Sequence, residues 1–123
     1  MPGFRCPTCD TLGLQLGPSL ELPADGRSDE ITLQALSCTS CDFLGVAIYE
    51  ESRRGASESW HHDGMPLCEL DHHRLVRDLR ACPAPRDRAC GCEVHERYNR
   101  VEGYSHVGFR LFRQGGPVFP LKR

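Results

Sequence analysis

The sequence predicts a small α+β protein, and three observations support this fold class. The first half of the chain carries alternating apolar and polar residues, the pattern of half-buried strands. One later segment, residues 68–81, has apolar residues at helical spacing. The 123 residues include eight cysteines, four of them in two Cys-x-x-Cys pairs, whereas only 7% are aromatic. A chain with so thin an apolar interior and so many paired cysteines is expected to depend on bound metal.

Three segments of the first half have the pattern of strands. Apolar side chains recur at alternate positions over 12–22 and over 31–35, and residues 43–49 form a short apolar run rich in strand formers. A cluster of turn-forming residues separates the first two segments. We therefore expect antiparallel hairpins over residues 1–51. The polar, Gly- and Ser-rich stretch over 52–65 is expected to be a linker or loop.

Residues 66–123 are predicted to hold one helix, a Cys/His-rich loop and a closing strand packed on the N-terminal sheet. Pro66 and Pro83 bracket the helical pattern. Residues 83–95 show no period and are expected to be irregular. Alternation over 107–111 predicts the closing strand.

The two Cys-x-x-Cys pairs predict a first metal site. The pairs are Cys6 with Cys9 and Cys38 with Cys41, and 28 residues separate them. A Cys-x-x-Cys turn aims two thiolates at one point, so two such turns at the ends of hairpins can close a tetrahedral Cys₄ site around Zn²⁺. A thioredoxin-like redox site would need only one pair, in a βαβ context. We expect one zinc here, which would offset the small core.

This pattern resembles the zinc-ribbon superfamily over about residues 4–50. The resemblance rests on both Cys-x-x-Cys turns and on the strands between and after them. It implies an antiparallel β-sheet with a structural zinc. Zinc ribbons occur in transcription factors, RNA polymerase subunits, ribosomal proteins and enzymes, so the resemblance implies a fold and a metal and leaves the function open.

A second group of three cysteines and a histidine follows the predicted helix: Cys82, Cys90, Cys92 and His95. Four such ligands within fourteen residues can close a second tetrahedral site, Cys₃His. Cys68 is the alternative fourth ligand, but an uninterrupted helix would place it about 21 Å from Cys82. We therefore prefer His95, and we expect Cys68 to be a buried apolar residue on the inner face of the helix. Gly91, between two ligands, is expected to permit a sharp turn.

Two enzyme-linked alternatives stay open. Asp71-His72 is similar to the Asp-His of HNH-type nucleases, in which a histidine activates water beside a divalent metal, although a second downstream Cys-x-x-Cys is missing. Asp29-Glu30, in the loop of the first hairpin, is similar to the acidic pair of RNA polymerase transcript-cleavage factors. There the acids help to hold a catalytic Mg²⁺. Both short motifs also have a non-catalytic explanation: the histidines can be exposed or packed in the core, and the acidic pair can be ordinary solvated turn residues.

Charge and hydropathy restrict the partners and the compartment. The net charge of −2 excludes bulk attraction to nucleic acid, but residues 96–123 carry six basic and two acidic residues and could bind it locally. No apolar run approaches the roughly 20 residues that a membrane helix needs. With no export signal after Met1, we expect no membrane association and a cytoplasmic location.

The expected function follows from the type of motif that the chain carries. Every strong motif is structural, because four protein ligands leave zinc no open position for water. We therefore expect a non-catalytic, zinc-binding accessory or interaction module. Its partner is expected to be an unknown protein, with nucleic acid as the second possibility.

Overall fold

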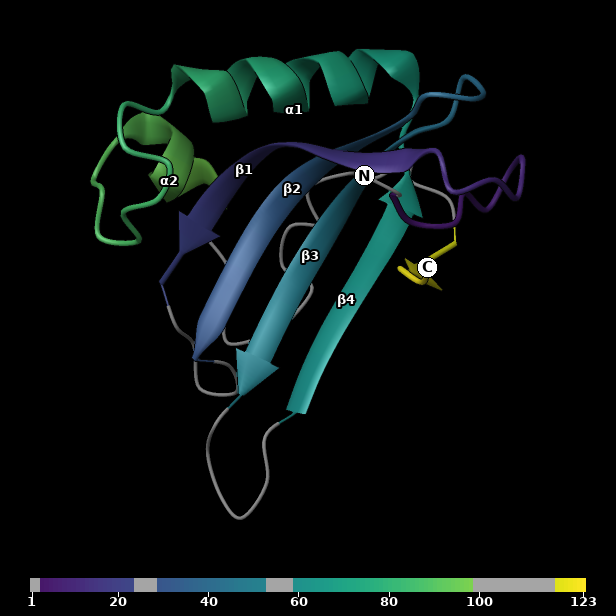
Figure 1. Ribbon diagram of the computed structural model, residues 1–123. Helices are drawn as coiled ribbons and strands as arrows, with labels where there is room; N and C mark the ends of the chain where they lie inside the picture. The colour runs from purple at the N-terminus through teal and green to yellow at the C-terminus, as the bar shows by residue number, and fades with distance from the viewer. Residues whose placement is uncertain (1–2, 24–28, 53–58, 99–116) are drawn as a thin grey trace.

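The computed structural model describes residues 3–23, 29–52, 59–98 and 117–123 (Figure 1). Five antiparallel strands form one sheet in the order β1-β2-β3-β4-β5, and a helix crosses one of its faces. The elements are β1 (Leu14–Leu22), β2 (Glu30–Cys38), β3 (Leu44–Ser52), β4 (Ser59–Pro66), α1 (Glu69–Ala81), α2 (Glu93–Tyr98) and β5 (Phe119–Pro120). The predicted α+β class is confirmed. Within the described ranges, no helix is long and apolar enough to cross a membrane.

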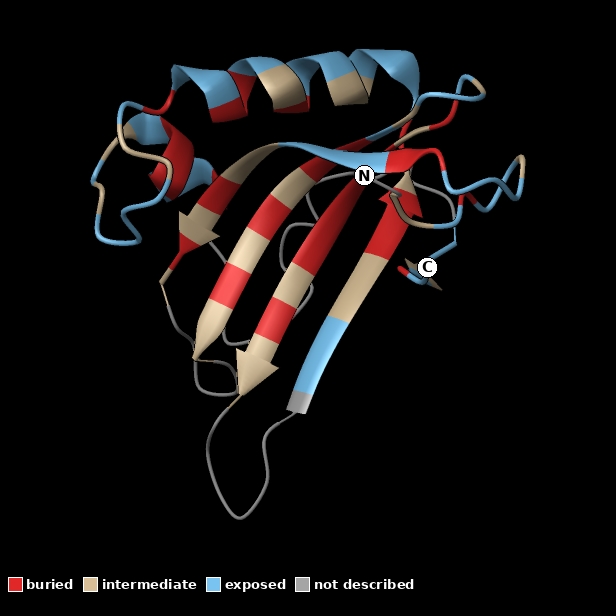
Figure 2. Cartoon of the chain, in the orientation of Figure 1, coloured by how far each residue is buried: buried red, intermediate tan, exposed pale blue. Residues whose placement is uncertain are grey.

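The main apolar core lies between α1 and the sheet. Alternate residues of β2 and β3 face the helix, and Leu33 pairs with Ile48 at the centre of this face. From α1, Leu75 and Leu79 are buried against them at helical spacing. Figure 2 shows the buried residues of α1 on the side toward the sheet and exposed residues on the outer side. The one strongly periodic helix of the sequence is therefore the one that covers the core.

Two predictions made for the second half of the chain were wrong. Residues 59–65, expected to be a linker or loop, belong to β4, which pairs along its whole length with β3. The segment lacks an apolar signal because Trp60 and His61 are exposed and only its last residues, such as Met65, reach the core. Residues 93–95, expected to be irregular, begin α2, a helix of 6 residues that is too short to show a period.

Other predictions stay untested. The closing strand expected over 107–111 lies outside the described residues, and the strand that the structure does describe in this region is β5. The division of the chain at residues 51 and 66 stays a prediction.

The outer strand β1 is interrupted at Gly17-Pro18. The pairing with β2 shifts there, between Leu16 and Ser19, which marks a β-bulge or irregularity. Proline has no amide hydrogen and is tolerated at such edge positions. A broken edge offers a poor template for another strand, so this feature protects β1 from edge-to-edge pairing.

A buried carboxylate joins the two helices. Asp78 of α1 accepts a hydrogen bond from the Tyr98 hydroxyl at 2.9 Å and another from Arg97 Nη1 at 2.8 Å. Asp78 is only 8% exposed, so these donors replace the water that its charge would otherwise require. Burial, together with the hydrogen bond to Asp78, raises the pKa of Tyr98, so the hydroxyl keeps its proton and donates. The contact fixes α2, which carries His95, against α1.

We predict that Tyr98→Phe destabilises the fold by about 1.5–3 kcal/mol, the range for a hydrogen bond to a charged group. The test is urea denaturation of the metal-loaded protein. Arg77→Gln is the control, because Arg77 approaches Asp78 only to 3.7 Å and is largely exposed, so a change under about 0.5 kcal/mol is expected. Equal losses in the two variants would contradict the role given to Tyr98.

Candidate metal centres

The first cluster brings together the four cysteines of the two Cys-x-x-Cys pairs. Cys6 and Cys9 precede β1, Cys38 ends β2, and Cys41 lies in the turn to β3. The four Sγ atoms lie within 4.8 Å of one another, with Cys6 to Cys41 at 3.6 Å and Cys9 to Cys38 at 3.7 Å. A tetrahedral ion with bonds to sulfur of about 2.3 Å would set these sulfurs about 3.8 Å apart. The cluster therefore has the size of a tetrahedral thiolate site, and none of its cysteines forms a disulfide.

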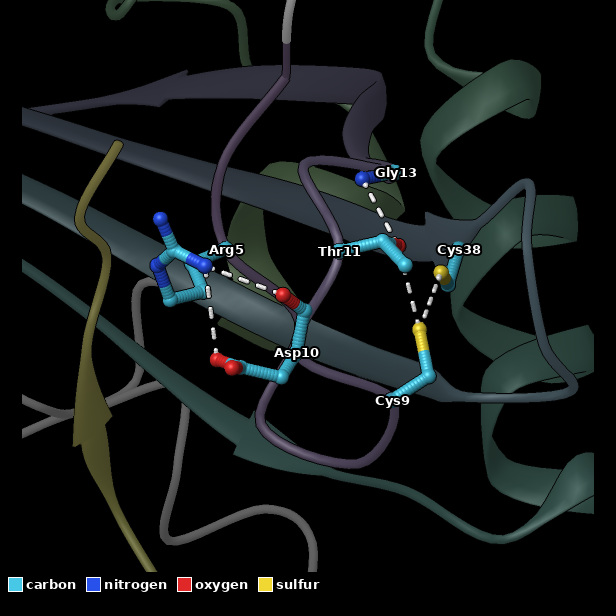
Figure 3. Close-up of polar contacts among 6 residues, drawn as sticks. All are labelled: Arg5, Cys9, Asp10, Thr11, Gly13 and Cys38. Carbon is cyan, nitrogen blue, oxygen red and sulfur yellow. Dashed lines mark hydrogen bonds and ion pairs between the residues drawn. The ribbon is translucent and has the colours of Figure 1, made fainter.

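A tight turn positions the first pair, and Figure 3 shows Cys9 of this pair with its neighbours Asp10 and Thr11. The amide of Asp10 donates to the Cys6 carbonyl at 2.9 Å, and the amide of Cys6 donates to the Thr11 carbonyl at 2.8 Å. Asp10 has a φ of 61°, a left-handed conformation that aspartate tolerates better than most residues. Arg5 donates to the Asp10 carbonyl at 2.9 Å and holds the turn from outside.

Hydrogen-bond donors surround the sulfurs of this cluster. Backbone amides of Ser40 and Phe43 donate to Cys38 and Cys41 at 3.3 and 3.4 Å. The Thr11 hydroxyl lies 3.1 Å from Cys9 Sγ, and because it accepts from the amide of Gly13, its own hydrogen can point to the sulfur. Such donors stabilise thiolates, the form that binds metal.

The pKa values of the clustered thiols diverge. The Thr11 side chain, followed by its backbone, lowers the pKa of Cys9 to about 6. For Cys41, the amide of Phe43 acts to lower the pKa, but burial and the neighbouring thiols raise it to about 12. Thiolates this close repel one another, so one ionises readily and the next resists. A divalent cation is the group that lets all four ionise together.

Gly13 lies close to the side chains of the first cluster. A Cβ atom at this position would lie 2.8 Å from Ser40 Oγ and 3.1 Å from Cys38 Sγ. The first distance is shorter than real Cβ contacts, so any larger residue would displace a side chain of the second Cys-x-x-Cys turn. No pattern in the sequence predicts this contact of Gly13.

The second cluster is formed at the junction of the two helices. Cys82 caps the C-terminus of α1, Cys90 follows a turn, Cys92 immediately precedes α2, and His95 lies within α2. Sγ of Cys82 lies 3.9 Å from that of Cys90 and 3.5 Å from that of Cys92, and His95 Nδ1 lies 3.3 Å from both Cys82 and Cys92. All four ligand atoms lie within 4.8 Å of one another, so this group too can hold a metal ion.

The loop between Cys82 and Cys90 is shaped by Asp87. The amide of Asp87 donates to the Ala84 carbonyl, and the amide of Cys90 donates to the Asp87 carbonyl, both at 3.0 Å. The carboxylate accepts from the amide of Ala89 at 2.9 Å, which is an Asx turn. This turn returns Cys90 to the cluster.

A backbone carbonyl of β1 orients His95. Nε2 of His95 lies 2.9 Å from the Glu21 carbonyl oxygen, which can only accept, so Nε2 carries the hydrogen. Nδ1 then keeps its lone pair toward the cysteines, the arrangement found in metal-ligating histidines. The amide of Glu21 in turn donates to the Pro85 carbonyl at 2.7 Å. Both hydrogen bonds tie the second cluster to the end of β1, and no sequence signal indicated Glu21.

The thiols of the second cluster also diverge in pKa. The backbone and the imidazole of His95 lower the pKa of Cys92 to about 6, and burial raises that of Cys82 to about 11. As in the first cluster, the pKa of one thiol is lowered and that of a neighbouring thiol is raised. Its inner members, Cys82 and His95, are 6% and 3% exposed.

The prediction for Cys68 was half right. The helix α1 separates Cys68 from Cys82 without a break, and Cys68 takes no part in the cluster, so His95 is the better fourth ligand. Cys68 is exposed at the N-terminus of α1, however, and the predicted burial on the inner helix face was wrong. Gly91 does not adopt a left-handed φ, and a Cβ atom there would meet nothing within 4 Å, so the turn does not depend on glycine.

The residues of the two enzyme-linked alternatives lie elsewhere. Among the described residues, the groups that can hold a metal are the two clusters above, and neither includes Asp71-His72 or Asp29-Glu30. Nε2 of His72 is buried without a hydrogen-bond partner in the described part, and burial lowers the pKa of His72. Glu30 is the first residue of β2, paired with Glu51, so it does not lie in the loop as predicted.

The chain matches no protein-family model, no curated protein and no solved structure. The first cluster is consistent with a zinc-ribbon-like motif, and membership of the superfamily stays a prediction.

We predict that Gly13→Ala lowers the metal affinity of the first cluster, because the added methyl displaces Ser40 or Cys38. Gly91→Ala is the matched control and should keep full metal content, since open space surrounds it. The measurement is elemental analysis after dialysis against a weak chelator. Loss of metal from both variants, or from neither, would refute the proposed close approach.

Proposed function

We propose that each cluster binds one Zn²⁺ and that both ions are structural. The observation that carries the proposal is the completeness of the two donor sets, Cys₄ and Cys₃His, within 4.8 Å. Zinc prefers such nitrogen and sulfur ligands in tetrahedral geometry, and catalytic zinc keeps one position for water. Four protein ligands leave no such position. The second hydrogen bond of His95 and the amide donors to sulfur supply the outer contacts that a thiolate metal site needs.

We infer that the protein is a zinc-stabilised accessory or interaction module. The two clusters lie at opposite ends of β1: the first next to Leu14 and the second next to Glu21. In these places the ions would tie the N-terminal segment and the helix junction to the sheet. Metal ions in both clusters would hold the surfaces of the module in place for binding. Any catalysis would be carried out by its partner.

Metal content tests the two sites separately. We expect two zinc ions per chain in the native protein and one in each of Cys38→Ser and Cys90→Ser, because each variant breaks one set of ligands. Cys68→Ser is the matched control, an exposed cysteine outside both clusters, and should retain both ions. Two ions in Cys90→Ser would remove the second site, and none in the native protein would remove both.

Removal of the metal tests the structural role. Structural zinc in isolated zinc fingers contributes on the order of 10 kcal/mol of apparent folding free energy, so a strong chelator should unfold much of the sheet. The measurement is circular dichroism during chelator titration, with re-addition of zinc to show reversibility. In the Co²⁺-substituted protein, the visible spectrum should report tetrahedral thiolate coordination. A five-coordinate spectrum with exchangeable water would contradict structural sites and would favour a catalytic metal.

A further inference from the structure

The outer face of α1 carries a line of arginines. Arg74, Arg77 and Arg80 are exposed on the helix, away from the residues that pack on the sheet, and 64% of the Arg77 side chain is exposed. We call these three residues the α1 arginine stripe. An open depression of about 460 Å³ adjoins the stripe and is lined by His73, Val76, Arg77, Arg80 and Ala81. The outer side of α1 in Figure 2 is correspondingly exposed.

Two of the three positive charges of this stripe lack an acidic partner in the described structure, and the third has a weak one. Neither Arg74 nor Arg80 makes an ion pair there, and Arg77 approaches only Asp78, at 3.7 Å. Asp78 is already bound by Tyr98 and Arg97, so it neutralises Arg77 weakly. Asp71, in the first turn of α1, lies three residues before Arg74 but forms no ion pair with it in the described structure, and Glu69 lies farther from the stripe. Like charges three residues apart on a helix repel one another, and Arg80, in the last turn of α1, is the arginine of the stripe that the helix dipole stabilises.

We propose that the α1 arginine stripe binds the phosphate backbone of nucleic acid. Successive arginines are about 4.5 Å apart along the helix axis, so the three span about 9 Å. One strand of a duplex carries a phosphate about every 3.4 Å of its axis, so the stripe faces two to three phosphates. The planar guanidinium fork matches phosphate oxygens, and a phosphate can enter the open depression beside Arg77 and Arg80.

The composition of this face favours nucleic acid over an acidic protein. Protein interfaces usually contain a core of aromatic or apolar anchors, whereas interfaces with nucleic acid are more polar and strongly positive. Leu70 is the large apolar residue exposed on the described part of α1, and it lies a full turn before the stripe. The proposal rests on the proposed interaction role and names the class of partner. It places the contact on α1, whereas the sequence had pointed to residues 96–123.

Fluorescence anisotropy tests the proposal on the zinc-loaded full chain. The probes are a labelled single-stranded oligonucleotide, a labelled duplex and a labelled polyglutamate peptide, each titrated at 50 and 200 mM salt. The variant Arg74→Gln/Arg77→Gln/Arg80→Gln removes the stripe and keeps good helix formers. The matched control, Arg86→Gln/Lys122→Gln/Arg123→Gln, makes the same change in net charge at exposed residues outside α1.

Three phosphate contacts give a salt slope of about −2.1 for a single strand and about −2.7 for a duplex, so native binding to nucleic acid should weaken about 20- to 40-fold between the two salt concentrations. The stripe variant should lose this salt dependence and bind at least about ten-fold more weakly at 50 mM, whereas the control should stay near native.

Equal losses in variant and control, native-like binding by the variant, or tighter binding of polyglutamate would each overturn the proposal. Zinc content is measured on the same samples. If the native protein holds two zinc ions but does not bind nucleic acid, only the role proposed for the arginine stripe is rejected. If the native protein holds no zinc, the proposed function is rejected.

Discussion

The convergence of four ligands at each end of β1 is the constraint on which the structure depends. The first cluster joins the segment before β1 to the turn between β2 and β3, and the second joins the end of α1 to α2. Segments far apart in the chain meet at the first cluster, and at the second the contact between His95 and the Glu21 carbonyl brings β1 to the helix junction. A small chain with few aromatic residues buries little apolar surface, so metal bonds at these two junctions would supply cohesion that its interior lacks.

The contacts around the ligands matter as much as the ligands. Thr11 and the amides of the second turn stabilise charge on the first set of sulfurs. In the second cluster, Glu21 sets the orientation of the imidazole, and the buried Asp78 holds the helix that carries it. These outer contacts position the donors at tetrahedral separations, which reduces the reorganisation that metal binding would require. They also connect both clusters to the sheet and to α1.

The helix α1 has two faces with different roles. Its inner face, with Leu75 and Leu79, completes the apolar core, and its C-terminus supplies Cys82 to the second cluster. Its outer face carries the arginine stripe, which no described acidic side chain neutralises apart from the weak approach to Asp78. A helix anchored at one end by a metal cluster would present that stripe in a fixed orientation. The proposed zinc and the proposed nucleic-acid contact are linked through this helix.

The sequence by itself determined the ligand types, their spacing and the helix, because Cys-x-x-Cys turns and a helical period are local patterns. It also favoured His95 over Cys68, since helix length alone separates Cys68 from Cys82. Only the tertiary structure decided the rest. The sequence did not predict β4, because this strand forms through its pairing with β3 and has no apolar alternation of its own. The exposed position of Cys68 depends on how α1 lies on the sheet. The roles of Glu21 and of Gly13 arise from contacts between distant segments, which no local pattern records.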